Sequence, residues 1–179
     1  MLGPVDCGHM EIDAYLDEID RLWPRAGEPP ARELVDLCSQ GVEEHPESST
    51  LWYDLGIIME RCDEAYAFTA DDSRRCFENA VKCDPNNAEA YQELGYVLDV
   101  YFSDYAGAEQ AFNKAIQLGA ERESYFGRAR SLAQAGRTED AIKSLSQDAC
   151  PFHDDLDIQK LRTEILDGSW FSELNEENS

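Results

Sequence analysis

The stretch that decides the fold runs from residue 51 to residue 120, where one pattern occurs twice. The first copy opens with LWYDLG at residues 51–56, and the second opens with YQELGY at residues 91–96. An aromatic residue and a leucine three positions apart share one helix face, and the adjacent glycine lets a neighbouring helix approach closely. The recurring positions are Trp52, Leu55, Gly56, Phe77, Ala80 and Pro85 in the first copy, and Tyr91, Leu94, Gly95, Phe112, Ala115 and Ala120 in the second. Each copy therefore predicts two helices that bury their apolar faces against each other.

A third copy follows, and the spacing between copies points to a family. Its recurring positions are Tyr125, Arg128, Ala129, Gly136, Ala141 and Leu145. Tyr91 and Tyr125 are 34 residues apart, and Trp52 and Tyr91 are 39 apart. At these positions the chain resembles the tetratricopeptide repeat family, whose period is 34 residues. The longer first copy predicts an insertion of five residues, which we place at residues 64–71.

The resemblance implies an all-α fold, a right-handed α-solenoid of antiparallel helix pairs. Apolar residues also recur at helical spacing before and after the three copies, in residues 11–23, 31–44 and 154–166. We therefore expect four segments: a divergent N-terminal pair at 1–47, three clear pairs at 48–153, a capping helix at 154–168 and an acidic tail at 169–179. In the tail, Trp170 and Phe171 either fold back on the capping helix or dock on a partner.

Local signals predict where several helices begin and end. Side chains that accept hydrogen bonds from free backbone N–H groups are common at the residue before a helix. The candidates are Ser48 or Ser49, Asp71 or Asp72, Asn87, Ser103 or Asp104, and Asp154 or Asp155. The third pair is expected at residues 123–134 and 138–147, with Gly136 at the reversal between them.

Composition and charge narrow the kinds of partner. A hydrophobic content of 42% argues against disorder, and the net charge of -23 repels nucleic acid and anionic membranes. No run approaches the roughly 20 apolar residues of a membrane span, and the start of the chain has no secretory signal. We therefore expect a cytoplasmic protein with protein or peptide partners. Gly8-His9-Met10 resembles a cloning scar, so residues 1–10 can be partly foreign to the natural protein.

No pattern for catalysis or metal binding is present in the sequence. The six cysteines and three histidines do not have zinc-ligand spacing, and the cysteines are interpreted as buried apolar residues in a reducing compartment. Phosphate-binding glycine loops and nucleophile motifs are absent. We expect no enzyme activity, no metal and no cofactor.

The resemblance implies a binding surface on the concave face, lined by the first helix of each pair. Carried over by their offset from the aromatic position, the groove residues are Tyr53, Ile57, Glu60, Glu89, Glu93, Tyr96, Asp99, Phe126 and Arg130. Family members that hold the acidic tails of heat-shock chaperones place Lys, Arg and Asn there, and this chain does not. An acidic surface with aromatic side chains instead suits a basic, or mixed basic and apolar, peptide. The alternative is that the aromatic residues pack only on neighbouring helices.

Basic residues concentrate in the third pair. The group consists of Arg122, Arg128, Arg130, Arg137 and Lys143. We expect these side chains to bridge to carboxylates of the second pair, with Arg128 replacing an apolar residue at a contact between repeats.

These features predict a non-catalytic adaptor for protein–protein interaction. Two other classes stay open: an acidic chaperone or nucleic-acid mimic that shields a basic protein, and a self-assembling structural scaffold. The sequence names neither the partner nor the oligomeric state.

Overall fold

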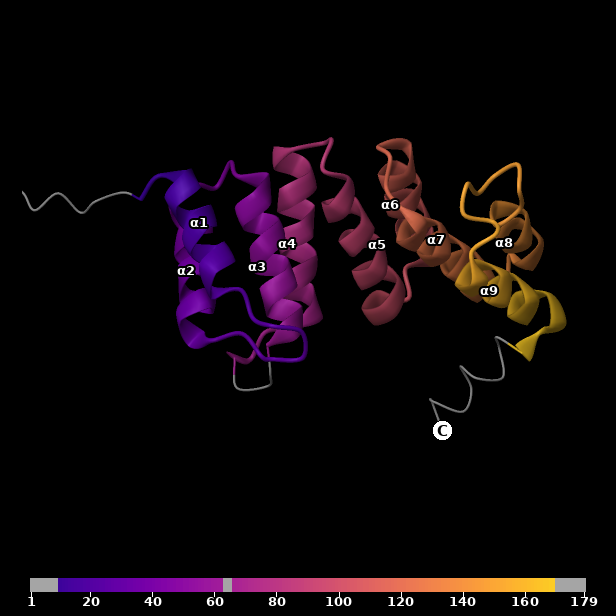
Figure 1. Cartoon of the computed structure of the whole chain (residues 1–179), viewed down its shortest axis with the longest axis horizontal. Coiled ribbons are helices and arrows are strands. Elements are labelled where there is room, and N and C mark those ends of the chain that lie inside the picture. Colours follow the sequence, from indigo (N-terminus) through magenta and orange to yellow (C-terminus); the bar gives the residue numbers. More distant parts are fainter. Residues whose placement is uncertain (1–9, 63–65, 170–179) are drawn as a thin grey trace, which may run out of the picture. The chain divides into compact units, whose positions relative to one another are not determined.

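The computed structural model describes residues 10–62 and 66–169, and these residues form α-helices and no strands. The predicted all-helical class is therefore confirmed. The chain divides into two compact units, Met1–Pro85 and Asn86–Ser179, which are described separately below. Within each unit consecutive helices are joined by connections of varying length, and a long one links α8 to α9 (Figure 1).

The first unit contains the divergent N-terminal helices and the first clear pair. Its helices are α1 (Ile12–Leu22), α2 (Arg32–Glu44), α3 (Ser49–Arg61) and α4 (Ala70–Cys83). Ser48 caps α3 by accepting a hydrogen bond from the backbone N–H of Leu51, as predicted. The prediction for α4 was wrong, because its cap is Thr69. Asp72 accepts hydrogen bonds from both the backbone N–H (2.9 Å) and the hydroxyl (2.7 Å) of Thr69, so it supports the helix start from inside the first turn.

The core of the first unit joins all four helices. Its largest fully buried side chains are Tyr15, Phe77, Ile19, Leu34, Leu51 and Ile58. Cys38 and Cys76 are also buried, and the described cysteines carry free thiols. Within the connection before α4, Tyr66 and Phe68 stack with ring centroids 6.1 Å apart and pack on this core. The described part of the inserted segment thus covers apolar surface of its own unit.

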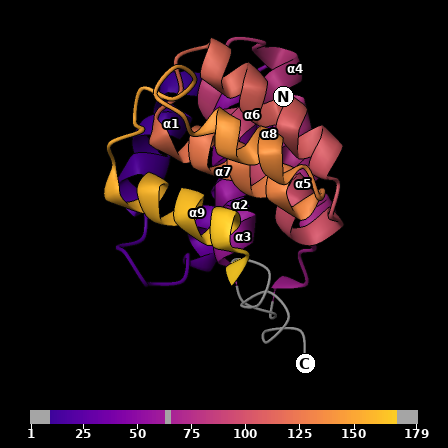
Figure 2. The same cartoon turned by 90° about the vertical axis from the view of Figure 1, so that its right-hand side faces the viewer.

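The second unit holds the other two clear pairs and the final helix. Its helices are α5 (Ala88–Phe102), α6 (Tyr105–Gln117), α7 (Arg122–Gln134), α8 (Thr138–Ser144) and α9 (Leu156–Asp167). Asn87, Asp104 and Asp155 cap α5, α6 and α9 with their side chains. The second helix of the third pair is shorter than predicted, because α8 ends at Ser144 instead of continuing to residue 147. Helices α8 and α9 face the viewer in Figure 2.

Phe112 is the centre of the packing among α5, α6 and α7. Its side chain is fully buried on α6. A Cβ atom added to Gly95 on α5 would lie 2.9 Å from the Phe112 ring, and one added to Gly127 on α7 would lie closer still. The ring therefore occupies the space that both glycines leave free. The pattern predicted the role of Gly95 but not that of Gly127, because Gly127 lies outside the recurring positions of the third copy.

Helix α9 buries Ile158, Leu161 and Ile165 within the second unit. It ends at Gly168, whose positive φ of 81° favours glycine. Most of the remaining α9 positions are charged or polar, as expected of a terminal helix. The two docking alternatives for Trp170 and Phe171 fall outside the described residues.

Candidate functional site

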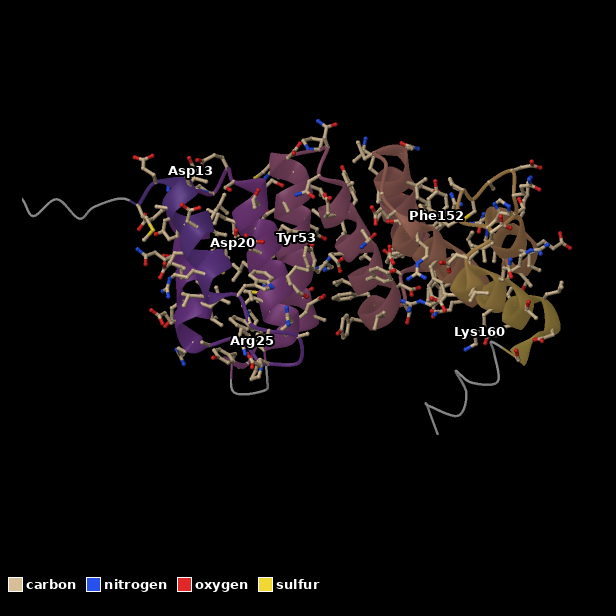
Figure 3. All side chains as sticks on the ribbon, viewed as in Figure 1. Asp13, Asp20, Arg25, Tyr53, Phe152 and Lys160 are labelled. Carbon is tan, nitrogen blue, oxygen red and sulfur yellow. The ribbon has the colours of Figure 1, made fainter. Side chains whose placement is uncertain are left out.

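A pocket of about 320 Å³ opens between α5, α7 and α9 of the second unit. We call it the aromatic pocket, and its lining residues are Tyr96, Arg122, Glu123, Phe126, Asp157, Lys160, Leu161 and Glu164. The ring of Tyr96, the ring of Phe126 and the side chain of Leu161 supply the apolar surface. Lys160, labelled in Figure 3, projects from α9. Three aromatic or aliphatic side chains therefore stand beside five charged ones in the lining of this pocket.

Tyr96 both lines the pocket and holds the helices together. Its hydroxyl donates a hydrogen bond of 2.8 Å to the backbone carbonyl of Glu123 on α7. Its ring meets that of Phe112 edge to face, with centroids 5.0 Å apart. Burial raises the pKa of Tyr96 to about 12, so the phenol keeps its proton at neutral pH. The two interpretations of Tyr96, groove lining and helix packing, are thus compatible.

Ion pairs fix the charged wall of the aromatic pocket. The Arg122 guanidinium donates hydrogen bonds to carboxylate oxygens of Glu123 (3.1 Å), Asp155 (3.2 Å) and Asp157 (2.7 Å). These three carboxylates surround one cation and raise the pKa of Arg122. On α9, Lys160 pairs with Glu164 at 3.4 Å, and the Lys160 side chain is 73% exposed. The wall therefore carries more negative than positive charge.

A second pocket of about 310 Å³ adjoins the start of α5 and the connection from α6 to α7. We call it the acidic pocket, and its lining residues are Ala88, Glu89, Gln92, Leu118, Gly119, Ala120, Glu121 and Glu123. Three of these are glutamates and none is basic. Glu123 lines both pockets, so the two are neighbours on the surface of one unit.

The structure gathers some of the predicted groove residues and separates others. Tyr96 and Phe126 line the aromatic pocket, and Glu89 lines the acidic pocket. Glu93 lies on α5, where burial raises the pKa of its carboxyl group. Tyr53, Ile57 and Glu60 lie on α3 of the first unit. Their place in a groove shared with the second unit stays a prediction.

Asp99 and Arg130 are turned toward each other instead of toward a groove. The Asp99 side chain is buried, and its Oδ2 atom accepts a hydrogen bond of 2.8 Å from Nε of Arg130. Its Oδ1 atom accepts a second bond, 2.9 Å long, from the hydroxyl of Ser131. The pair joins α5 to α7, so we correct its assignment from groove lining to helix packing. A carboxylate that lies between two helices has its hydrogen bonds satisfied by them and not by a ligand.

Comparison with known proteins finds tetratricopeptide repeats in part of the chain. Models described as tetratricopeptide repeat match residues 76–110 and 97–154. The chain belongs to the tetratricopeptide repeat family. It is also 32% identical over 138 residues to Superkiller protein 3 of Schizosaccharomyces pombe, a match that covers 72% of this chain and 10% of that protein. The chain thus spans about a tenth of the length of this relative.

Solved structures share the fold of this tetratricopeptide repeat protein. YrrB, described as a TPR protein with an unusual peptide-binding site, has a TM-score of 0.63 at 17% identity, with 87% of this chain and 86% of YrrB covered. MamA has a TM-score of 0.61 at 17% identity, with 87% of this chain and 73% of MamA covered. At these identities the likeness concerns the fold alone, a helical repeat solenoid.

The carboxylate partners predicted for the arginines of the third tetratricopeptide repeat are found for some of these arginines and not for others. Arg130 and Arg137 pair with Asp99 and Glu109 of the second repeat, as expected. The prediction for Arg122 was wrong, because two of its carboxylates belong to the start of α9. Arg128 has no carboxylate partner among the described residues: it donates to Asn113 (3.2 Å) and to the backbone carbonyl of Ser144 (3.1 Å). Burial lowers the pKa of its guanidinium.

The residues of α9 and Glu121 were missing from the predicted site. Asp157, Lys160, Leu161 and Glu164 recur at three- and four-residue steps on one face of α9. The sequence analysis assigned groove residues to the first helix of each pair. Treating α9 as the first helix of a further pair would have identified these four residues as well.

Within residues 10–62 and 66–169, no helix combines the length and the apolar character needed to cross a membrane. The same residues hold no group of three or more His, Cys, Asp or Glu side chains arranged for a metal ion.

One half-buried carboxyl group in the first unit, that of Asp54, makes stability depend on pH. Burial and the negative charge of Asp20 raise the pKa of Asp54 to about 7. In the unfolded chain an aspartate ionises near pH 4. Between about pH 4 and 7 the unfolded state therefore loses its proton first, and the folded state is destabilised as the pH rises. Asp20, labelled in Figure 3, lies on α1.

We expect Asp54→Asn to raise the free energy of unfolding by about 2 kcal/mol at pH 8 and by little at pH 4. The amide replaces a half-buried charge with a neutral group of the same shape. Urea unfolding followed by tryptophan fluorescence at both pH values measures this difference. The control is Asp17→Asn, which removes an exposed carboxylate from α1. An equal gain from both variants would show that total charge, and not Asp54, is responsible.

Proposed function

We propose that this protein is a non-catalytic adaptor that binds a peptide segment of another protein on the surface formed by α5, α7 and α9. The observation that carries the proposal is the aromatic pocket, in which side chains from three alternate helices of the second unit meet. Tyr96 and Phe126 offer apolar surface of the kind that anchors a partner side chain. Helical repeat proteins stack their units to create such extended surfaces.

The surrounding charge favours a basic, or mixed basic and apolar, segment. The aromatic pocket contains three carboxylates against two cations, and the acidic pocket contains three carboxylates and no cation. The net charge of -23 adds a long-range attraction for positively charged partners. YrrB, which shares the fold, is described as having a peptide-binding site.

The proposal assigns no catalytic step and no cofactor, because tetratricopeptide repeats generally serve protein binding. A cytoplasmic location is part of the proposal. It is supported by the described cysteines, which are all free thiols.

The test begins with selection of peptides from a random 12-residue phage library against the full chain. We expect the selected sequences to contain apolar side chains together with Lys or Arg. Phe126→Ala should weaken the binding of a selected peptide at least tenfold, because Phe126 provides ring surface in the aromatic pocket. Isothermal titration calorimetry with the synthetic peptide measures the change in Kd.

The matched control is Ile142→Ala. Ile142 is partly buried against the same core as Phe126 but lies outside the aromatic pocket. It should leave the Kd unchanged. If both variants bind the peptide as tightly as the parent protein does, the pocket is not the binding site.

A further inference from the structure

The two pockets of the second unit meet at one residue. Glu123 lines the aromatic pocket on one side and the acidic pocket on the other. Its backbone carbonyl accepts the hydrogen bond from Tyr96, and its carboxylate accepts one from Arg122. These bonds hold Glu123 in place between the pockets. A bound segment can therefore fill both pockets at once.

The pockets differ in the chemistry that they accept. In the aromatic pocket, Phe126, Leu161 and the ring of Tyr96 provide apolar contact. In the acidic pocket, Glu89 and Glu121 have no ion-pair partner within the described part of the chain, and both side chains are exposed. A Lys or Arg side chain would neutralise the charge there, whereas an acidic one would be repelled.

Helix geometry sets the distance between the pockets. Glu89 and Tyr96 are seven residues apart on α5, which at a rise of 1.5 Å per residue corresponds to about 10 Å. An extended peptide advances about 3.3 Å per residue. About three residue steps therefore carry a chain from one pocket to the other.

We propose that the bound segment places an apolar side chain in the aromatic pocket and a Lys or Arg in the acidic pocket, with about two residues between them. This inference rests on the proposed function. It adds which kind of side chain enters each pocket and how many residues separate the two side chains. The partner is recognised by two side chains at a fixed separation and not by its total positive charge.

The probes are acetylated and amidated Ser/Gly decapeptides that each carry one Leu and one Arg, separated by zero to six residues in both orders. Fluorescence anisotropy measures their affinity for the full chain in 0.15 M salt. We expect the tightest binding in one order at a separation of two or three residues. Replacing Arg by Glu in that peptide should weaken binding at least tenfold.

The double variant Glu89→Gln/Glu121→Gln tests the acidic pocket. We expect it to reduce the preference for Arg over Glu in the peptide by about five- to tenfold. The control variant, Glu139→Gln/Asp148→Asn, removes two exposed carboxylates outside both pockets and should retain the preference. Equal loss in both variants would show that only bulk charge matters.

The outcomes separate this inference from the proposed function. Binding that depends on Phe126 but is independent of the separation between Leu and Arg overturns the inference and leaves the adaptor proposal standing. Binding that is unaffected by Phe126→Ala overturns both.

Discussion

Replacing Arg130 with Met is expected to lower the free energy of unfolding by about 3 to 5 kcal/mol. The substitution leaves the buried carboxylate of Asp99 without its cation and with the hydroxyl of Ser131 as its remaining hydrogen-bond donor among the described residues. It also removes the guanidinium that lies over the ring of Tyr96, 5.6 Å from the ring centroid. Urea unfolding followed by circular dichroism measures the loss.

A double-mutant cycle separates the stability contributed by the Asp99–Arg130 ion pair from the cost of leaving the Asp99 carboxylate buried without a cation. Asp99→Leu/Arg130→Met removes both charges and should recover most of the stability, because an apolar pair costs little where an unpaired charge costs much. Arg137→Met is the control. Its guanidinium is 48% exposed and pairs with Glu109 and Asp140, so its loss should cost less than about 1 kcal/mol. Equal costs for Arg130→Met and Arg137→Met would contradict a buried role for the Asp99–Arg130 pair.

Replacing Gly127 with Leu should destabilise the second unit by about 3 kcal/mol, toward the upper end of the cost of overpacking. The new side chain would enter the space of the Phe112 ring. The ring cannot move far in response, because a shift away from α7 brings it closer to α5 at Gly95. Thermal unfolding followed by circular dichroism measures the effect.

The smaller substitution Gly127→Ala identifies the cause. Alanine favours the helix by about 1 kcal/mol relative to glycine, so any net loss must come from contact with the ring. Adding Phe112→Leu should relieve that contact and make the double variant more stable than the sum of the two single changes predicts. Strict additivity would mean that the two positions do not touch.

Much of the fold could be predicted because its signals are local. The 34-residue repeat follows from the aromatic, leucine and glycine positions, and the structure has the helices where these positions placed them. The caps at Ser48 and Asn87 follow from side chains that bond to backbone groups two or three residues away. The errors at Thr69 and at the end of α8 occurred where neighbouring residues offered nearly equivalent choices for a helix end.

The lining of the two pockets could be predicted only in part, for the same reason. Tyr96, Phe126 and Glu89 were found because their offset within a repeat determines the face on which they lie. Asp99 occupies an equally promising offset but is buried by a partner that lies 31 positions further along the chain. The contribution of α9 depends on contacts with α7 that no repeat signature records.

The sequence by itself determined the helices, their order and the glycine–aromatic contacts within the repeats, because periodicity and steric fit act over a few turns of one helix. Only the tertiary structure decided which charges face solvent and which face each other. Charge pairing depends on side chains from separate helices. Because acidic residues are in excess, each arginine has many possible carboxylate partners, and the sequence does not distinguish among them. The packing of helices α5 to α9 makes that selection, and it leaves Glu89 and Glu121 exposed.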